Sequence, residues 1–252
     1  MGYDNLRLEK GMYRQSGKSF TQVLESLDPS ENYRGTALEN TDAFQRQLKR
    51  FGIRAKGLDS SPVEKFFATM DSAVLFPEYI ARTVRQGMEE NDILPNIVAT
   101  TTVIDAMDYR SIYSVPTEDD KELKDVAEGA EIPTTEIKTK EHLANLKKRG
   151  RMLVASYEAI RFQKLDLFSV MLRQIGAYMQ KQLLKDAVNV IIDGDGNENA
   201  AIAYSVGSSP ISGTSGKLEY NQLVEFWAQF DPYTMNTLLC STPTMTAMLK
   251  IP

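Results

Sequence analysis

A long amphipathic segment from Leu165 to Ile192 constrains the fold more than any other feature of the sequence. Apolar residues recur at intervals of three and four, with charged and amide side chains between them, as on one face of an α-helix. Asp166 suits the N-terminal cap or first turn, and Gly194 suits the C-terminal stop. Such a helix is roughly 40 Å long. Because the apolar positions keep no a/d heptad, we expect the helix to pack along a sheet instead of forming a coiled coil.

Composition limits the classes of protein that fit. The chain has 252 residues, a formal net charge of −5 and one cysteine. The acidic balance argues against broad binding to nucleic-acid phosphates, which needs clustered cations, and leaves only weak, local contact with DNA. Cys240 has no partner for an internal disulfide, and we expect it as a small core residue. Without a secretory signal or about 20 consecutive apolar residues, the sequence predicts a soluble protein made in a cytoplasm.

The first half of the chain changes character twice. Residues 1–62 are polar and interrupted by turns, with short helical patterns such as Thr41–Phe51, and are expected to form an extension without a packed core. The apolar spacing over 63–91 predicts a short helix, a break at Pro77 and a second helix. The segment 93–115 is rich in Ile, Val, Thr and Tyr, which predicts strands.

The segment from Thr117 to Gly150 is densely charged and poor in large apolar residues. Acidic side chains dominate its first part and lysines its second, and an apolar stretch follows at Met152–Ala155. This pattern predicts an extended β-hairpin arm, which buries too little surface to be stable alone and needs a surface to lie on. Its opposite charges are expected to set the register between neighbouring copies. The candidate assembly residues are Glu118, Asp119, Asp120, Glu122, Lys138, Lys140, Lys147 and Lys148.

The last part of the chain alternates loop and regular structure. Residues 197–217 are rich in Gly, Ser and Asn and predict a loop. The spacing predicts a helix over Leu218–Phe230, a strand over Met235–Cys240 and a further helix over Thr242–Leu249. Since no closing strand follows, this region is interpreted as an incomplete domain.

A glycine-rich stretch at Gly213–Lys217 superficially resembles a phosphate-binding loop. That loop requires Gly five residues before the Gly-Lys pair and Ser or Thr after it, so that amides and a hydroxyl hold phosphate and magnesium. The two positions are Ile211 and Leu218 here. The sequence therefore argues against nucleotide binding.

Metal and nucleophile patterns are also incomplete. Asp193–Gly196 begins like a calcium loop, but Glu198 and Tyr204 stand where Gly and a bidentate Glu are needed. His142 is the only histidine, and with one cysteine it cannot build a zinc cluster or favour a Ser-His-Asp arrangement. The sequence predicts no catalytic residues, no cofactor and no metal, and hence a protein that is not an enzyme.

A series of short motifs nevertheless follows a recognisable order. The motifs are Gly129–Pro133, Ser156–Glu158, Leu165–Asp166, Lys185–Ala187 and Gly194–Asn197. In this order the chain resembles the major capsid proteins of tailed phages, over about residues 73–252 and most closely over 126–199. The predicted elements after residue 217 are similar to the axial domain of that family.

The resemblance implies an α+β phage major-capsid fold with a long spine helix, a peripheral domain, an extended β-hairpin arm and an axial domain. Residues 1–62 match nothing in the family and are left open between a removable pro-segment, a scaffold-like segment and a long N-terminal arm. The implied division is 63–110 for the N-terminal arm and start of the peripheral domain, 111–155 for the extended loop, 156–194 for the spine helix, and 195–252 for an apparently incomplete axial domain.

The resemblance also implies a function. The chain would be a structural subunit of a phage or prophage icosahedral capsid, assembling with itself into the pentamers and hexamers of a shell around double-stranded DNA. Scaffolding and portal proteins would be partners, and assembly in the bacterial host cytoplasm would place the protein in the virion. Two alternatives stay open: an encapsulin-type nanocompartment shell, which would co-purify with a cargo enzyme, and a helical adaptor whose arm grips a partner.

Overall fold

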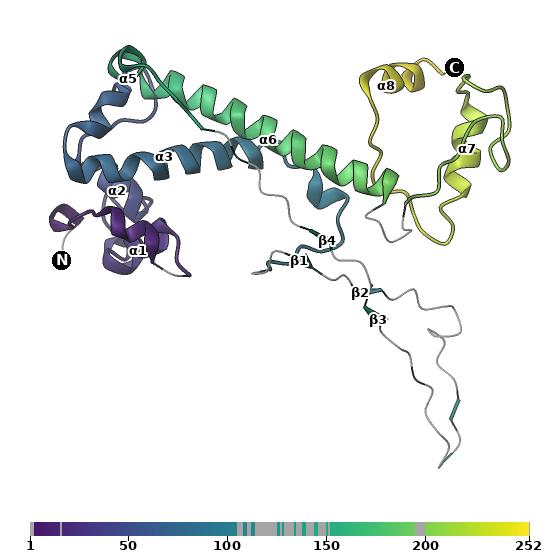
Figure 1. Cartoon of the computed structure of the whole chain (residues 1–252), viewed down its shortest axis with the longest axis horizontal. Helices are drawn as coiled ribbons and strands as arrows, with labels where there is room; N and C mark the ends of the chain where they lie inside the picture. The colour runs from purple at the N-terminus through teal and green to yellow at the C-terminus, as the bar shows by residue number, and fades with distance from the viewer. Residues whose placement is uncertain are drawn as a thin grey trace. The chain divides into compact units, whose positions relative to one another are not determined.

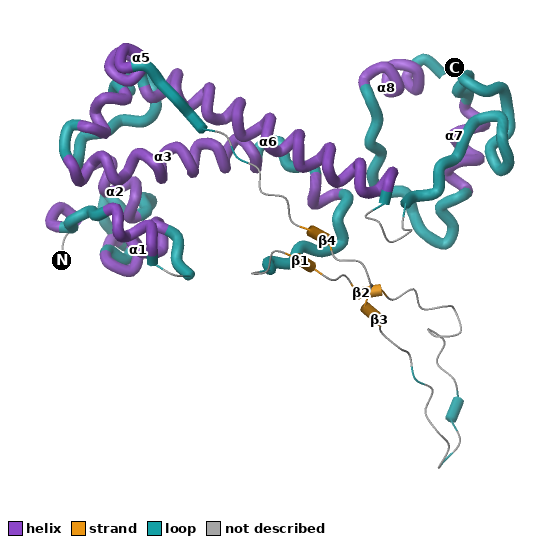
Figure 2. Tube along the Cα trace, in the orientation of Figure 1, coloured by secondary structure: helices purple, strands orange, loops and turns teal. Residues whose placement is uncertain are grey.

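The computed structural model places the chain in two compact units. Unit 1 comprises Met1–Asp92 with Gly150–Leu183, and unit 2 comprises Ile93–Arg149 with Leu184–Pro252. Figure 1 traces the chain, and Figure 2 shows that helices supply nearly all of the regular structure that is described. The structure describes residues 3–15, 17–104, 108–109, 112–113, 125–126, 128, 134, 138–139, 144–145, 150, 152–194 and 200–251.

The regular elements described in unit 1 are helices. Its main helices begin at caps that the sequence encodes: the side chains of Ser19, Asp42 and Thr69 each accept a hydrogen bond from the amide three residues on. Its elements are η1 (Tyr3–Asn5), η2 (Lys10–Arg14), α1 (Phe20–Leu27), η3 (Ser30–Tyr33), α2 (Ala43–Arg50), η4 (Val63–Phe67), α3 (Met70–Glu89), α5 (Tyr157–Phe162) and the first part of α6 (Leu165–Asp193).

The first 62 residues are part of the core of unit 1, so the expectation of an extension without a packed core is wrong. Nine of the 17 residues in the buried apolar cluster come from this segment, and the others come from η4, α3 and α6. Phe20 and Leu24 of α1 and Phe44 of α2 are among the nine. The N-terminal segment and the two longest helices therefore share one hydrophobic core.

A buried arginine explains why the polar sequence of this segment did not predict a core. Arg46 is fully buried, and its Nε donates to Asp28 Oδ2 over 2.7 Å while Nη2 donates to the Asp28 carbonyl over 2.6 Å. Nη1 donates to Ser30 Oγ over 3.0 Å, and the guanidinium lies 4.3 Å from the centre of the Tyr33 ring. The charge is fully paired, which is what allows a charged side chain to occupy the interior.

The predicted break at Pro77 is also wrong, because α3 is a continuous helix of 20 residues with Pro77 in its interior. Proline removes one ladder hydrogen bond and crowds the preceding turn. At this turn the Tyr13 hydroxyl donates to the Val74 carbonyl over 2.8 Å and accepts from the Glu78 amide over 3.1 Å. A tertiary contact from η2 thus satisfies the backbone where the proline disturbs it.

The expected α+β fold class is wrong for the described part of the chain. Its named strands are four two-residue segments: β1 (Asp108–Tyr109) pairs antiparallel with β4 (Ala144–Asn145), and β2 (Ile112–Tyr113) with β3 (Lys138–Thr139). No larger sheet is described for α6 to pack along, and α3 covers its buried face instead. Most of the expected hairpin arm lies outside the described residues.

In the predicted strand region 93–115 the described strands are the two-residue β1 and β2, and the predicted strand at 235–240 is absent. Described residues 98–104 have no regular structure and follow η5 (Leu94–Asn96), and residues 235–240 have none either. A β-rich composition is a weak prior that a lack of pairing partners overrides.

The helix predictions after residue 164 are confirmed. α6 spans Leu165–Asp193, with Asp166 in its first turn. It ends at Gly194, whose φ of 76° is the left-handed conformation typical of a helix stop, and whose amide donates to the Val190 carbonyl. In unit 2, α7 (Tyr220–Ala228) and α8 (Thr242–Leu249) form where the spacing predicts them.

Candidate functional site

Two glycines let the backbones of α3 and α6 touch within unit 1, where the helices run side by side in the same direction (Figure 1). A Cβ atom on Gly176 would lie 2.1 Å from the Val84 carbonyl oxygen, and one on Gly87 would lie 2.2 Å from that of Arg173. No larger residue fits at either position without moving backbone. The contact fixes α3 against α6, and with it the surface that α3 presents.

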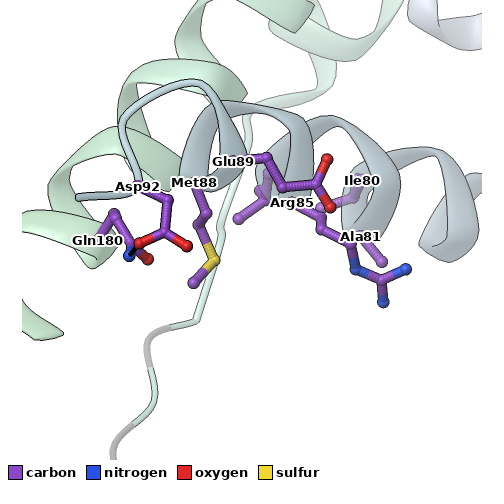
Figure 3. Close-up of a pocket in the computed structure, with 8 residues that line it drawn as sticks. Ile80, Ala81, Arg85, Met88, Glu89, Asp92 and Gln180 are labelled. Atoms are coloured by element: carbon purple, nitrogen blue, oxygen red, sulfur yellow. Dashed lines mark hydrogen bonds between the residues drawn. The ribbon is translucent and has the colours of Figure 1, made fainter. Parts of the chain in front are cut away.

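A groove of about 510 Å³ follows α3 next to this contact (Figure 3). Ile80, Val84 and Met88 share one face of the helix because they are four residues apart, and they give the groove an apolar lining. Arg85 and Glu89 also line it, and both are exposed. The groove therefore combines an apolar strip with a positive and a negative charge one turn apart.

The far end of the groove is closed by a polar pair. Figure 3 shows Gln180 of α6 facing Asp92, and the Gln180 Nε2 donates to Asp92 Oδ1. Gln180 is buried although it belongs to the apolar face of α6. The hydrogen bond explains how a buried amide is tolerated there.

A second, smaller hollow of about 160 Å³ shares Ile80 with the groove. Leu153 and Ala155, which are themselves exposed, line it together with Ile160 of α5 and Phe168 of α6. Segment 152–162, which we call the lid, contacts the core of unit 1 through Ile160.

Four large apolar side chains of the lid do not line this hollow and are open to solvent. Met152 and Val154 are 85% and 80% exposed, and Tyr157 and Phe162 are 69% and 71% exposed. We call these four residues the outer face. Glu158 and Arg161 are also exposed on the lid, one helical turn apart. Large apolar side chains gathered in water are typical of an interaction surface.

A buried tyrosine holds α3 to α6. Burial raises the pKa of Tyr79 to about 12, and its hydroxyl donates to the Leu165 carbonyl over 3.1 Å, so it keeps its proton and holds α3 to α6. Within the described ranges, no group of three or more His, Cys, Asp or Glu side chains could hold a metal. No described helix is long and apolar enough to cross a membrane.

The eight candidate assembly residues cannot be located on this surface. Of that set, only Lys138 has a described backbone, in β3, and the other seven lie outside the described residues, as does His142. The calcium-like motif is described only up to Gly194, at the end of α6.

The glycine-rich loop before α7 closes on an acidic side chain. The Glu225 carboxylate accepts hydrogen bonds from the Ser212 amide and hydroxyl, both over 2.6 Å, and these bonds lower the pKa of Glu225. A fixed carboxylate at the loop repels phosphate. This geometry agrees with the incomplete phosphate-loop pattern at Gly213–Lys217.

The residues that shape this site were not among those predicted from the sequence. Gly87 and Gly176 interrupt helical patterns, and an isolated glycine in such a pattern is a signal for close backbone packing. The outer face had a weaker signal, the two apolar residues Met152 and Val154 at alternate positions before a helix. Cys240 was expected in the core and is exposed.

Residues 139–252 match the family described as phage capsid protein. The match supports the predicted resemblance to phage capsid proteins, and the matched residues include α5, α6 and the outer face. The match points to a structural role in a phage capsid instead of an enzyme. Neither the curated proteins nor the solved structures include a match to the chain.

Proposed function

We propose that the chain is a major capsid protein, which assembles with copies of itself into the shell that encloses the double-stranded DNA of a phage or prophage. The observation that carries this proposal is the phage capsid domain over residues 139–252. In this role the protein is assembled in the host cytoplasm, with scaffolding and portal proteins as partners, and resides in the virion.

The surface of unit 2 supports self-assembly. Among its described residues only Ile211 and Gln222 are buried, whereas Tyr220, Trp227 and Leu249 are each more than half exposed. Burying apolar area yields about 25 cal/mol per Å². Packing of these described, exposed side chains against other molecules would therefore contribute favourable free energy.

The charge of the chain fits a container for DNA. A net charge of −5 disfavours tight adhesion of the packaged genome, so contact with DNA stays weak and non-specific. Within this proposal, the charged arm sets the register between neighbouring subunits through complementary potentials. Its acidic residues are Glu118, Asp119, Asp120 and Glu122, and its basic residues are Lys138, Lys140, Lys147 and Lys148.

Sedimentation velocity over a concentration series, followed by negative-stain microscopy of the same sample, tests the proposal. We expect large species that grow with concentration and appear as closed particles or as rings. A co-purifying enzyme inside the particles would instead identify a nanocompartment shell. A single compact species at every concentration would refute the capsid role and favour an adaptor.

A further inference from the structure

The outer face of the lid is large enough to form the centre of an interface. An aromatic side chain carries about 150–250 Å² of surface. At 69% and 71% exposure, Tyr157 and Phe162 together leave roughly 200–350 Å² in water, and Met152 and Val154 add to it. A stable interface covers about 800 Å² on each partner and is anchored by a few aromatic residues near its centre. The outer face supplies such anchors, and surrounding surfaces supply the rest.

The α3 groove has the complementary chemistry. Its floor of Ile80, Val84 and Met88 can receive apolar side chains. Its rim charges, Arg85 and Glu89, form no ion pair within the described part of the chain, and Figure 3 shows both side chains extending from α3 on the side away from Gln180. With respect to the described residues, the groove thus presents one cation and one anion without an ion-pair partner.

The charges of the two surfaces match in order and spacing. Along α3 a cation precedes an anion by four residues, and along α5 an anion, Glu158, precedes a cation, Arg161, by three. Both separations correspond to about one helical turn, or 5–6 Å between Cβ atoms. With the helices parallel, Glu158 faces Arg85 and Arg161 faces Glu89.

We propose that the outer face of the lid in one copy docks into the α3 groove of a second copy. The proposal rests on the capsid function proposed above and names the surfaces through which subunits meet. Because face and groove are different surfaces of unit 1, the contact is head-to-tail, and repeated head-to-tail contacts close into a ring when the rotation allows it. The apolar residues provide most of the affinity, and the two charge pairs select partner and register.

Charge-swap variants of the full chain test this contact by sedimentation velocity. The first exchanges the lid charges (Glu158→Arg with Arg161→Glu), and the second exchanges the groove charges (Arg85→Glu with Glu89→Arg). Each turns two attractive pairs into repulsive ones and is expected to weaken self-association about tenfold or more. The variant with all four substitutions restores both attractive pairs and should recover wild-type association. The matched control exchanges the exposed pair Glu31 and Arg34, and should change nothing.

The outcomes separate this proposal from the proposed function. All of the exchanged residues are exposed, so thermal melting of dilute samples should be unchanged and loss of association cannot be ascribed to unfolding. If the wild-type chain assembles but the lid and groove swaps have no effect, or the fourfold variant fails to recover, the docking proposal is overturned while the capsid role stands. If the wild-type chain never self-associates, both are overturned.

Discussion

Replacing Gly176 with Ala is expected to destabilise unit 1 strongly. The added Cβ would lie 2.1 Å from the Val84 carbonyl oxygen, whereas ordinary contact begins at 3.4 Å, so the two backbones must separate by about 1.3 Å (3.4 − 2.1). Alanine gains about 1 kcal/mol of helix propensity. Overpacking costs about 1–3 kcal/mol, and loosening Phe168 and Leu172 from the core costs about as much again. The net loss of unfolding free energy should be about 1–5 kcal/mol.

Urea unfolding followed by far-UV circular dichroism measures this loss as a lower midpoint at similar slope. Gly11→Ala is the matched control, because a Cβ there meets nothing within 4 Å. Its effect should stay within about 0.5 kcal/mol. If Gly176→Ala unfolds at the same urea concentration as the wild type, then α3 and α6 are not in backbone contact and the groove is not fixed as described.

Three further changes probe the core and the loop before α7. Arg46→Met leaves the Asp28 carboxylate buried without its cation and should cost about 3–5 kcal/mol of unfolding free energy in the same assay; wild-type stability would contradict the buried pair. Ile175→Asp places an unpaired charge against the core and should abolish cooperative melting or solubility, whereas a parent-like melt would show that this face is open. The Ser212 bonds to Glu225 lower the carboxyl pKa, so their stabilising effect is complete above the pKa of the unfolded chain and is lost as pH falls through the lowered value. An NMR titration should show that the pKa of Glu225 rises toward its ordinary value in Ser212→Ala. An unchanged pKa would refute the hydrogen bond between the Ser212 hydroxyl and Glu225.

Periodic helices with sequence-encoded ends could be predicted. The prediction over Leu165–Ile192 agrees with α6 to within one residue, because a long apolar repeat and a left-handed Gly194 define both its face and its end. α8 likewise begins after Ser241, whose side chain accepts a hydrogen bond from the Thr244 amide. These are local signals, and they survive whatever tertiary contacts form.

Tertiary contacts explain why two predictions for residues 1–92 were wrong. Pro77 would end a free helix, but the Tyr13 hydroxyl from a distant segment satisfies the disturbed turn. Residues 1–62 look too polar to pack, yet Arg46 is buried with all of its partners supplied by that segment. Neither contact is encoded in local periodicity, so each became visible only in the folded chain.

The packing of residues 1–62 also bears on the three interpretations left open for them. Removing them would take nine of the 17 residues from the shared core and would break the ion pair between Asp42 and Arg82. The packing therefore agrees better with residues 1–62 as a retained part of the subunit than with a removable pro-segment.

The candidate site was less predictable than the helices. The charged arm was predicted as an assembly element because charge can be read from the sequence. The outer face and the groove instead depend on which apolar residues remain exposed after folding. Exposure is a property of the packed chain, since apolar residues at helical spacing are usually core.

Cryo-electron microscopy of the purified chain at assembly concentration tests the central claim most directly. The capsid account predicts particles built from repeated subunit contacts, in which neighbouring copies cover Tyr157, Phe162 and the exposed side of α7, including Trp227. Separate single chains that keep these side chains in solvent at every concentration would contradict it.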